Sequence, residues 1–260
     1  MNSETIKLEI VGTVGKITLN RPKVFNSFNQ EMSKAAQVAL DECCENPAIR
    51  AIYLTGEGRA FCAGQDLQEA MDPNGPDIKS IVDEHYNPLI LRLRSIEKPI
   101  VAAVNGVAAG AGANVALAAD VVVAKKSSVF VQAFSSIGLI PDSGGTFILP
   151  RLIGWQKASA LMMLADKIDA VEAERLGMIY KWFEDDQFEA ESWKLVEKLA
   201  NLPTKGLGYT KRLLNMSYHN SLEDQLKVEG EVQVLAASTH DFSEGVLSFM
   251  EKRKPVFTGN

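Results

Sequence analysis

The feature of this sequence that most constrains its fold is a repeated unit, in which a short apolar strand runs into a loop of small residues and then into a helix. Residues 49–54 lead into the loop 55–67, and residues 99–104 lead into the loop 105–112. Strands that are joined through helices lie parallel, and a parallel sheet needs helices on its faces. The pattern therefore predicts an α/β fold with a mainly parallel sheet.

The other elements follow from their hydrophobic periodicity. Strands are predicted at 6–10, 17–19, 121–124 and 129–134, and helices at 29–45, 78–96 and 113–119. Pro88 is expected to kink the helix 78–96. Beyond Gly154 the sequence reads as almost entirely helical, with segments at 155–165, 170–176, 187–202, 205–218, 222–237 and 242–252.

The chain is thus rich in strands first and in helices last. No Pro- or Ser-rich linker separates the two parts, so we expect one continuous unit. Its core is predicted to cover residues 1–200. A helical region over residues 201–260 is expected to pack on this core and on neighbouring subunits, because no strand remains for it to cover.

Composition narrows the class of protein. Of the 260 residues, 46% are hydrophobic and 23% are charged, which is ordinary for a packed chain. The net charge of −6 argues against a nucleic-acid-binding surface. No apolar run reaches the roughly 20 residues that span a bilayer. We expect neither a nucleic acid nor a membrane as partner.

The cysteines and the two ends of the chain bear on location. Three cysteines, of which Cys43 and Cys44 are adjacent, give neither a disulfide framework nor the CxxC spacing of a zinc site, so no metal is expected. Residues 1–10 lack the basic and apolar regions of a signal peptide, and residues 258–260 are not a peroxisomal signal. We expect a cytoplasmic protein.

Residues 137–146 read IGLIPDSGGT, an apolar approach followed by one carboxylate and a glycine pair. Asp142 and Ser143 are favourable helix N-caps, so Asp142 is on one interpretation only a cap worth about 1 kcal/mol. On the other, apolar neighbours such as Leu139 and Ile140 remove water from the carboxylate and raise its pKa, as proton transfer near neutral pH requires. We take Asp142 as the leading catalytic candidate.

Two loops of small residues have a shared potential function. Residues 61–64 (FCAG) and 110–112 (GAG) each follow a strand and precede a helix, which exposes backbone N–H groups. Two such donors can stabilise negative charge on a carbonyl oxygen, each worth on the order of 10² to 10³ in rate. Either loop alone is equally compatible with tight packing. Together with Asp142 they favour an oxyanion-binding site.

These motifs resemble those of the crotonase, or enoyl-CoA hydratase/isomerase, superfamily. The similarity runs through residues 20–23 (NRPK), 59–67 (RAFCAGQDL), 98–106 (KPIVAAVNG), 140–146 (IPDSGGT) and 251–255 (EKRKP). It implies a spiral of β-β-α turns with a helical C-terminal trimerisation region. It also implies an acyl-CoA substrate, a homotrimer or dimer of trimers, and no cofactor besides the coenzyme A of the substrate.

The resemblance assigns roles to individual residues. It places the N–H groups of an oxyanion hole on Ala63 and Ala111, with Gly110 as the alternative to Ala111. It places substrate- and CoA-binding positions on Lys23, Phe25, Ala60, Asp66, Leu67, Phe134, Lys252 and Lys254. Phe147 and Leu139 are further candidates for the acyl pocket, and all three apolar candidates are equally compatible with core packing.

One departure from the hydratases bears on the reaction. The two glutamates with which hydratases activate water correspond here to Asn114 and Phe134, which argues against hydration. An Asp at the position of Asp142 occurs in three other branches, namely the isomerase of ring-epoxidised phenylacetyl-CoA, 4-chlorobenzoyl-CoA dehalogenase and dihydroxynaphthoyl-CoA synthase. The first is the most similar. The expected activity is isomerisation, through a thioester enolate, of a ring epoxide or of a Δ3 double bond.

The sequence disfavours two other classes of protein. A dinucleotide fold is disfavoured because GxGxxG fails at Val115, and a hydrolase because no GxSxG is present and the histidines 85, 219 and 240 lack partners. Another crotonase activity (hydratase, dehalogenase- or naphthoate-synthase-like) or a non-catalytic CoA-thioester binder remains as an alternative. If Asp142 is not the proton shuttle, Glu69 and Asp66 are the next candidates.

Overall fold

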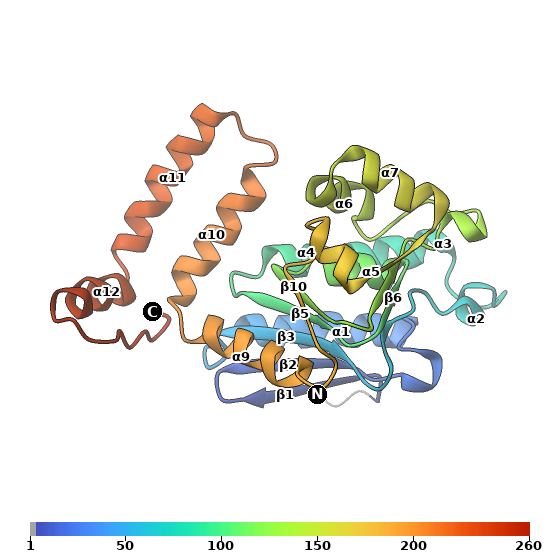
Figure 1. Ribbon diagram of the computed structural model, residues 1–260, viewed down its shortest axis with the longest axis horizontal. Helices are drawn as coiled ribbons and strands as arrows, with labels where there is room; N and C mark the ends of the chain where they lie inside the picture. Colours follow the sequence, from blue (N-terminus) through green and yellow to red (C-terminus); the bar gives the residue numbers. More distant parts are fainter. Residues whose placement is uncertain (1–3) are drawn as a thin grey trace.

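Two β-sheets form the core of the protein in the computed structural model, which describes residues 4–260 (Figure 1). Within these residues the larger sheet has six strands in the order β1-β2-β3-β5-β7-β10, and the smaller has four in the order β4-β6-β8-β9. Along the chain, β3 is followed by β4, β5 by β6, and β7 by β8, so each turn contributes one strand to each sheet. The predicted spiral of β-β-α turns is confirmed.

The larger sheet begins with an antiparallel hairpin formed by the strands predicted at 6–10 and 17–19, and it continues in parallel. Its strands are β1 (Ile6–Val11), β2 (Val14–Leu19), β3 (Ala51–Gly56), β5 (Ile100–Val104), β7 (Val121–Lys125) and β10 (Lys181–Phe183). Only β1 and β2 pair antiparallel; the other pairs of this sheet are parallel. The mainly parallel sheet expected from the sequence is therefore present.

The smaller sheet is made of three-residue strands. They are β4 (Ala60–Cys62), β6 (Val107–Ala109), β8 (Val129–Val131) and β9 (Lys167–Asp169). The regions of β4 and β6 were expected to be loops, and those of β9 and β10 to be helical or irregular; both expectations were wrong. Strands this short show no alternation of polar and apolar residues, and their pairing partners come from other turns of the chain.

Helices cover both faces of the larger sheet. They are α1 (Gln30–Glu45), α2 (Leu67–Ala70), α3 (Ile78–Ser80), α4 (Asn87–Ser95), α5 (Ala111–Leu117), α6 (Gly145–Ile153), α7 (Trp155–Leu164), α8 (Ala170–Arg175), α9 (Phe188–Ala200), α10 (Thr204–Met216), α11 (Leu222–Ala237) and α12 (His240–Met250). Shorter helical turns are η1 (Pro22–Val24), η2 (Ile81–Tyr86) and η3 (Ser135–Ile137). Of the helices in residues 4–260, none is long and apolar enough to cross a membrane.

The hydrophobic core has two parts because helices cover both faces of the larger sheet. The larger part joins the smaller sheet to α1, α4 and α5 through fully buried side chains such as Phe28, Phe61 and Leu93. The other part lies under α9, which packs on β2, β3, β5 and β7. There Tyr53 donates or accepts a 2.8 Å hydrogen bond with Ser192, so its hydroxyl is not left unpaired in the core.

The helix expected over residues 78–96 is interrupted by a wider turn. The turn η2 is π-helical, and the N–H of Asn87 donates to the carbonyl of Val82, five residues earlier. Pro88 then stands in the first turn of α4, where its missing N–H costs no hydrogen bond. The expected proline kink is therefore replaced by a π-turn, which carries the buried His85 and Tyr86.

The strand expected over 129–134 ends at Val131. Beyond it, the amide of the buried Gln132 donates to Asn114 Oδ1 at 2.8 Å, and the chain enters η3 directly after Phe134. Phe134 has a helical backbone conformation. The sequence of small and apolar residues does not distinguish this turn from a strand, because the contact that ends β8 comes from α5.

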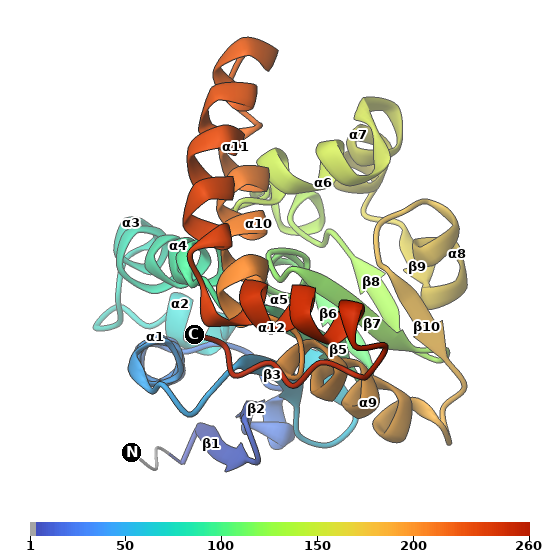
Figure 2. The same cartoon turned by 90° about the vertical axis from the view of Figure 1, so that its left-hand side faces the viewer.

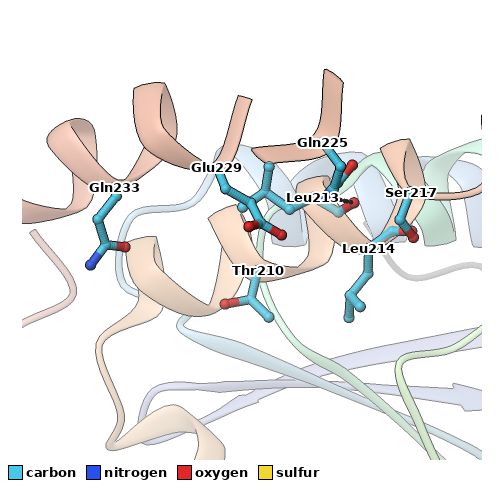
Figure 3. Close-up of a pocket in the computed structure, with 7 residues that line it drawn as sticks. All are labelled: Thr210, Leu213, Leu214, Ser217, Gln225, Glu229 and Gln233. Carbon is cyan, nitrogen blue, oxygen red and sulfur yellow. Dashed lines mark hydrogen bonds between the residues drawn. The ribbon is translucent and has the colours of Figure 1, made fainter. Parts of the chain in front are cut away.

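The last three helices project from the two-sheet core (Figure 1, Figure 2). From the middle of α10, Lys211 donates to Asp120 at 2.8 Å. At the outer end of the α10–α11 pair, the rings of Phe147 on α6 and Tyr218 lie 5.3 Å apart. Between α10 and α11 lies an open groove of about 390 Å³, into which Thr210 and Glu229 project (Figure 3).

Candidate active site

The segment that carries Asp142 connects η3 to α6. The N-cap of α6 is Gly144, which has no side-chain cap, and the Asp142 carboxylate does not bond a helix N–H. Instead, Asp142 Oδ1 accepts a hydrogen bond from Ser143 Oγ at 2.8 Å. The interpretation of Asp142 as a helix cap is therefore wrong, because the chain turns for two more residues before the helix begins.

The glycine pair after Ser143 allows this segment to approach α5. Gly145 donates to the backbone carbonyl of Asp142 at 2.9 Å, and Asn114 Nδ2 donates to the same carbonyl at 2.9 Å. A Cβ on Gly145 would lie 2.3 Å from Asn114 Nδ2, which is too close for any side chain. The backbone of Asp142 is thus held by α5, and its carboxylate is held by Ser143.

The pKa of Asp142 is raised above its ordinary value of 3.8. Burial is the main cause, and the hydrogen bonds from Ser143 and from its own backbone N–H partly oppose it. The raised pKa agrees with the expectation from the sequence, but the apolar neighbours named there do not cause it. The side chains of Leu139 and Ile140 are 45% and 81% exposed. A fully buried neighbour is Tyr86, whose own pKa is raised by burial and also by the charge of Asp142.

The two loops of small residues lie side by side. A Cβ on Gly64, which has a φ of +96°, would lie 3.0 Å from the carbonyl oxygen of Ala109 and 3.6 Å from the nitrogen of Ala111. A Cβ on Gly112 would lie 2.4 Å from the carbonyl oxygen of Cys62. These glycines permit the backbones to meet, so the two readings of the loops, tight packing and exposed N–H groups, both apply.

Only some of the N–H groups in these loops are free to bind an oxygen atom. The N–H of Ala63 donates to the carbonyl of Phe25 at 3.0 Å, and the N–H of Gly110 donates to that of Val131 at 2.8 Å. Both groups are therefore already occupied, which contradicts the expectation for Ala63 and removes Gly110 as the alternative to Ala111. Within residues 4–260 the N–H groups of Ala111 and Gln65 have no hydrogen-bond acceptor.

The orientation of Gln65 explains why its N–H is free. Gln65 forms a β-bridge with Phe28, in which Phe28 donates to Gly64 and Asp66 donates to Phe28. In such a bridge the N–H of the central residue points away from the partner. Gln65 was missed as a candidate donor, because the pairing with Phe28 that frees its N–H has no signal in the local sequence.

The side chain of Gln65 is also fixed. Its Oε1 accepts from the hydroxyl of Tyr86 at 2.9 Å, and its Nε2 donates to Glu69 Oε2 at 3.1 Å. Glu69 in turn accepts from the backbone N–H of Gln30 at 3.0 Å, at the start of α1. Glu69, a secondary candidate for proton transfer, is thus engaged in positioning the loop.

Asn114 and Phe134, which the resemblance places at the positions of the hydratase glutamates, are both buried. Asn114 bridges Gln132 and the backbone of Asp142 through its two amide atoms. The ring of Phe134 is 6% exposed and lies 3.7 Å from the position of a Cβ on Gly110. Neither side chain carries a proton that exchanges near neutral pH. The one carboxylate on this segment is that of Asp142.

The candidates for CoA binding divide into exposed and structural residues. Lys23, Phe25 and Leu67 are exposed, and the guanidinium of Arg59 lies 4.2 Å from the centre of the Phe25 ring. Arg59 was not singled out from the sequence, although its motif was. Asp66 forms a 2.9 Å ion pair with Arg21 and caps α2.

The remaining candidates for CoA binding are Ala60 and the two lysines Lys252 and Lys254. Ala60 is buried, so only its backbone is available; its carbonyl accepts from Asn26 at 2.8 Å. Lys252 and Lys254 are exposed beyond α12, which lies across α10 from α5 and α6 (Figure 1). One chain therefore does not bring these lysines to Asp142.

The histidines do not join the site. None of the three hydrogen-bonds Asp142 in the described part of the chain, and the buried His85 has no partner there for its Nε2. No group of three or more His, Cys, Asp or Glu side chains within residues 4–260 is arranged to hold a metal ion.

The sequence of the chain is similar to those of known proteins. The model of the enoyl-CoA hydratase/isomerase family matches residues 9–260. The chain is 46% identical over 246 residues to the 1,2-epoxyphenylacetyl-CoA isomerase of Escherichia coli (strain K12), covering 94% of each chain. It is 43% identical over 259 residues to a probable enoyl-CoA hydratase of Rhodobacter capsulatus, covering 100% of each.

The fold of the chain also matches those of solved structures. An enoyl-CoA hydratase from Polaromonas sp. JS666 superposes with a TM-score of 0.90 at 33% identity, over 97% of this chain and 99% of that one. An enoyl-CoA hydratase/isomerase from Cupriavidus metallidurans CH34 superposes with a TM-score of 0.91 at 30% identity, over 100% and 98%. With its two-sheet spiral and its paired loops, the chain belongs to the enoyl-CoA hydratase/isomerase family, the crotonase superfamily.

Proposed function

We propose that this enzyme is an acyl-CoA isomerase that acts through a thioester enolate, and that it converts 2-(1,2-epoxy-1,2-dihydrophenyl)acetyl-CoA to the oxepin form. The observation that carries the proposal is a single partly buried carboxylate, Asp142, in a site where an amide, Asn114, and a phenyl ring, Phe134, take the positions of the two hydratase glutamates. The name of the 46% identical relative supports the choice of substrate. Isomerisation of Δ3-enoyl-CoA to its Δ2 isomer is a second reaction of the same groups.

The free N–H groups of Gln65 and Ala111 are proposed to bind the thioester oxygen. They stabilise the enolate that forms when the α-carbon loses a proton, and each such donor is worth on the order of 10² to 10³ in rate. This assignment replaces Ala63, whose N–H is bonded to Phe25. Since both donors belong to backbone that is fixed by close packing, they need no reorganisation when charge develops.

Asp142 is proposed to carry the proton. For a Δ3 substrate it takes the proton from the α-carbon, the electron pair moves through the enolate, and the same proton returns at the γ-carbon. The product has the same composition as the substrate, so one carboxylate is sufficient. For the ring epoxide, the same acid and oxyanion donors are proposed to assist ring opening and rearrangement to the oxepin. No cofactor is needed besides the coenzyme A of the substrate.

Replacement of Asp142 by Asn tests this role. Turnover of the epoxide and of Δ3-enoyl-CoA should fall by on the order of 10² to 10⁴, because an amide cannot accept the proton. The fold should remain. A raised pKa means that the folded protein holds more protons than the unfolded one above pH 3.8, so folding stability falls as pH rises through this window. Asp142→Asn removes that effect, and its Tm should equal or exceed that of the wild type.

A matched variant controls for the loss of one negative charge. Asp166 is exposed, and Asp166→Asn should leave turnover and Tm unchanged. The measurement is kcat for each substrate by mass spectrometry of the CoA thioesters, beside thermal melting. A kcat of Asp142→Asn within a few-fold of the wild type would show that the proton shuttle lies elsewhere.

The proposal includes the cellular location and the oligomeric state of the enzyme. We place the reaction in the cytoplasm and expect a homotrimer or a dimer of trimers, with residues 1–200 as the catalytic core and residues 201–260 between subunits. Exposed apolar side chains on α11 and α12 support this, among them Val234 at 70% and Phe249 at 85% exposure. In such an assembly Lys252 and Lys254 are proposed to reach a CoA phosphate of a neighbouring subunit.

A further inference from the structure

Ser143 combines three properties that a linker residue does not need. It is 2% exposed, its backbone φ is +51°, and its hydroxyl donates to Asp142 Oδ1 at 2.8 Å. We propose that Ser143 is a positioning residue, whose hydroxyl orients the Asp142 carboxylate and keeps it available as a base. This inference rests on the proposed role of Asp142.

The backbone conformation shows what a serine contributes at this position. A residue with a Cβ is strained at this φ, whereas glycine adopts it freely. The next residue, Gly144, has a φ of +72° and is a glycine. Glycine at position 143 would therefore make the same turn at a lower cost. The property that serine adds, and glycine lacks, is the hydroxyl.

The surroundings leave the hydroxyl as the main polar contact of the carboxylate. Within residues 4–260, no other side chain hydrogen-bonds the carboxylate of Asp142. The ionisable group whose interaction with Asp142 the structure shows is Tyr86 on η2, and Cys62 on β4 acts on Tyr86 in turn. Burial raises the pKa of both, that of Cys62 to about 12, so they are neutral near pH 7. Glu69 on α2 acts on Tyr86 and is bonded to Gln65.

Asn114 on α5 completes the enclosure, but it bonds the backbone carbonyl of Asp142 and not its carboxylate. The carboxylate is therefore oriented by one side-chain donor, Ser143, besides its own backbone N–H. A donor to the charged form lowers the pKa and so opposes the effect of burial. Without the hydroxyl, the carboxylate should bind its proton more tightly and lose its preferred rotamer.

Two substitutions separate the hydroxyl from the backbone strain. Ser143→Ala keeps the Cβ and the strain but removes the donor, whereas Ser143→Gly removes both. The readout is the pH dependence of kcat/KM for the best substrate. In the wild type the rate is lost as pH falls through the raised pKa of Asp142, because the base must be ionised.

Both variants should move this acidic limb to higher pH by about 1 unit, which is a tenfold change in the acid dissociation constant. Both should also lower kcat about tenfold through the lost orientation of the base. Ser136, which is exposed and makes no side-chain hydrogen bond within the described residues, supplies the matched control. Ser136→Ala should leave profile and kcat as in the wild type.

Two results would contradict the proposed role of Ser143. An unshifted limb in Ser143→Gly overturns the inference, as does a defect of Ser143→Ala that Ser143→Gly repairs, since strain would then be the cause. If Ser143→Ala is too unstable to assay, Ser143→Gly, which has no strained Cβ, decides alone. An active Asp142→Asn refutes the proposed function itself. An inactive Asp142→Asn with unshifted Ser143 variants refutes only the role of Ser143.

Discussion

At the scale of single residues, the site is defined by which polar groups have partners. Both polar atoms of the Asn114 amide hydrogen-bond other parts of the protein. One accepts from Gln132, and the other donates to the backbone carbonyl of Asp142. Phe134 packs against the loop that carries Ala111. The carboxylate of Asp142 is left as the group that can exchange a proton with a substrate. This distribution of partners supports the proposed isomerisation over the addition of water.

The hydration of crotonyl-CoA should accordingly be very slow. Adding water to a conjugated double bond requires a base for the water and an acid for the carbon, and the site offers one carboxylate. We expect crotonyl-CoA hydration to be at least about 10²-fold slower than isomerisation of the best substrate, measured as loss of enoyl-thioester absorbance. Comparable rates would place a second acid in the site and contradict the proposed mechanism.

How far the site could be predicted depends on the range of its contacts. Asp142 and the loop 110–112 follow from local sequence, because an acid between a proline and a glycine pair and a glycine-flanked helix start are local signals. The choice of Ala111 over Gly110 does not, because it depends on the bond from Gly110 to Val131. Ala63 and Gln65 lie two residues apart and have similar local signals. Only the pairing of this loop with Phe25 and Phe28, some forty residues earlier in the chain, determines which N–H is free.

At the scale of elements, the close contact of β4 with α5 brings the two donor loops together. Gly112 lies against the carbonyl of Cys62, and Gly64 lies against Ala109 and Ala111. The long strands and helices around this contact could be predicted from periodicity. The three-residue strands could not, because their stability comes from neighbours in the adjacent turn of the spiral and not from their own composition.

A methyl group at Gly112 should therefore separate the loops. Its Cβ would lie 2.4 Å from a backbone oxygen that cannot rotate away. We expect Gly112→Ala to lower the free energy of unfolding by about 1 to 3 kcal/mol and to reduce kcat with it. The measurements are urea unfolding and turnover.

Gly230→Ala is the control variant for Gly112→Ala. It lies in α11 with nothing within 4 Å of its Cβ position. Gly230→Ala should leave kcat unchanged and stabilise the helix by about 0.5 to 1 kcal/mol. If Gly112→Ala were as stable and as active as Gly230→Ala, the close approach of the two loops would not hold.

At the scale of the whole molecule, the C-terminal region is attached to the core by polar contacts and leaves its apolar side chains outside. Arg50 bonds the carbonyls of Leu202 and Phe257, and Lys211 bonds Asp120. Meanwhile Leu222 and Met250 are 76% and 74% exposed. This imbalance could be anticipated from the excess of helices at the end of the sequence, but the anchoring residues could not, since they come from distant segments.

The protein should therefore form trimers or hexamers in solution. Light scattering at micromolar concentration is expected to give three or six times the 28.4 kDa of one chain. Charged substitutions at Phe249 and Met250 should shift the mass downwards, whereas Asp166→Asn should not. A single chain of about 28 kDa at that concentration would contradict the prediction.

The order of the strands has a consequence for how the chain folds. In both sheets, neighbouring strands follow the order of the chain, β1-β2-β3-β5-β7-β10 in one and β4-β6-β8-β9 in the other. Each new strand therefore closes a loop of little more than one turn of the spiral, which keeps the entropic cost of each step small. Folding can start in one turn and extend to the next, so we expect assembly of the core to proceed progressively along the chain, as in repeat proteins.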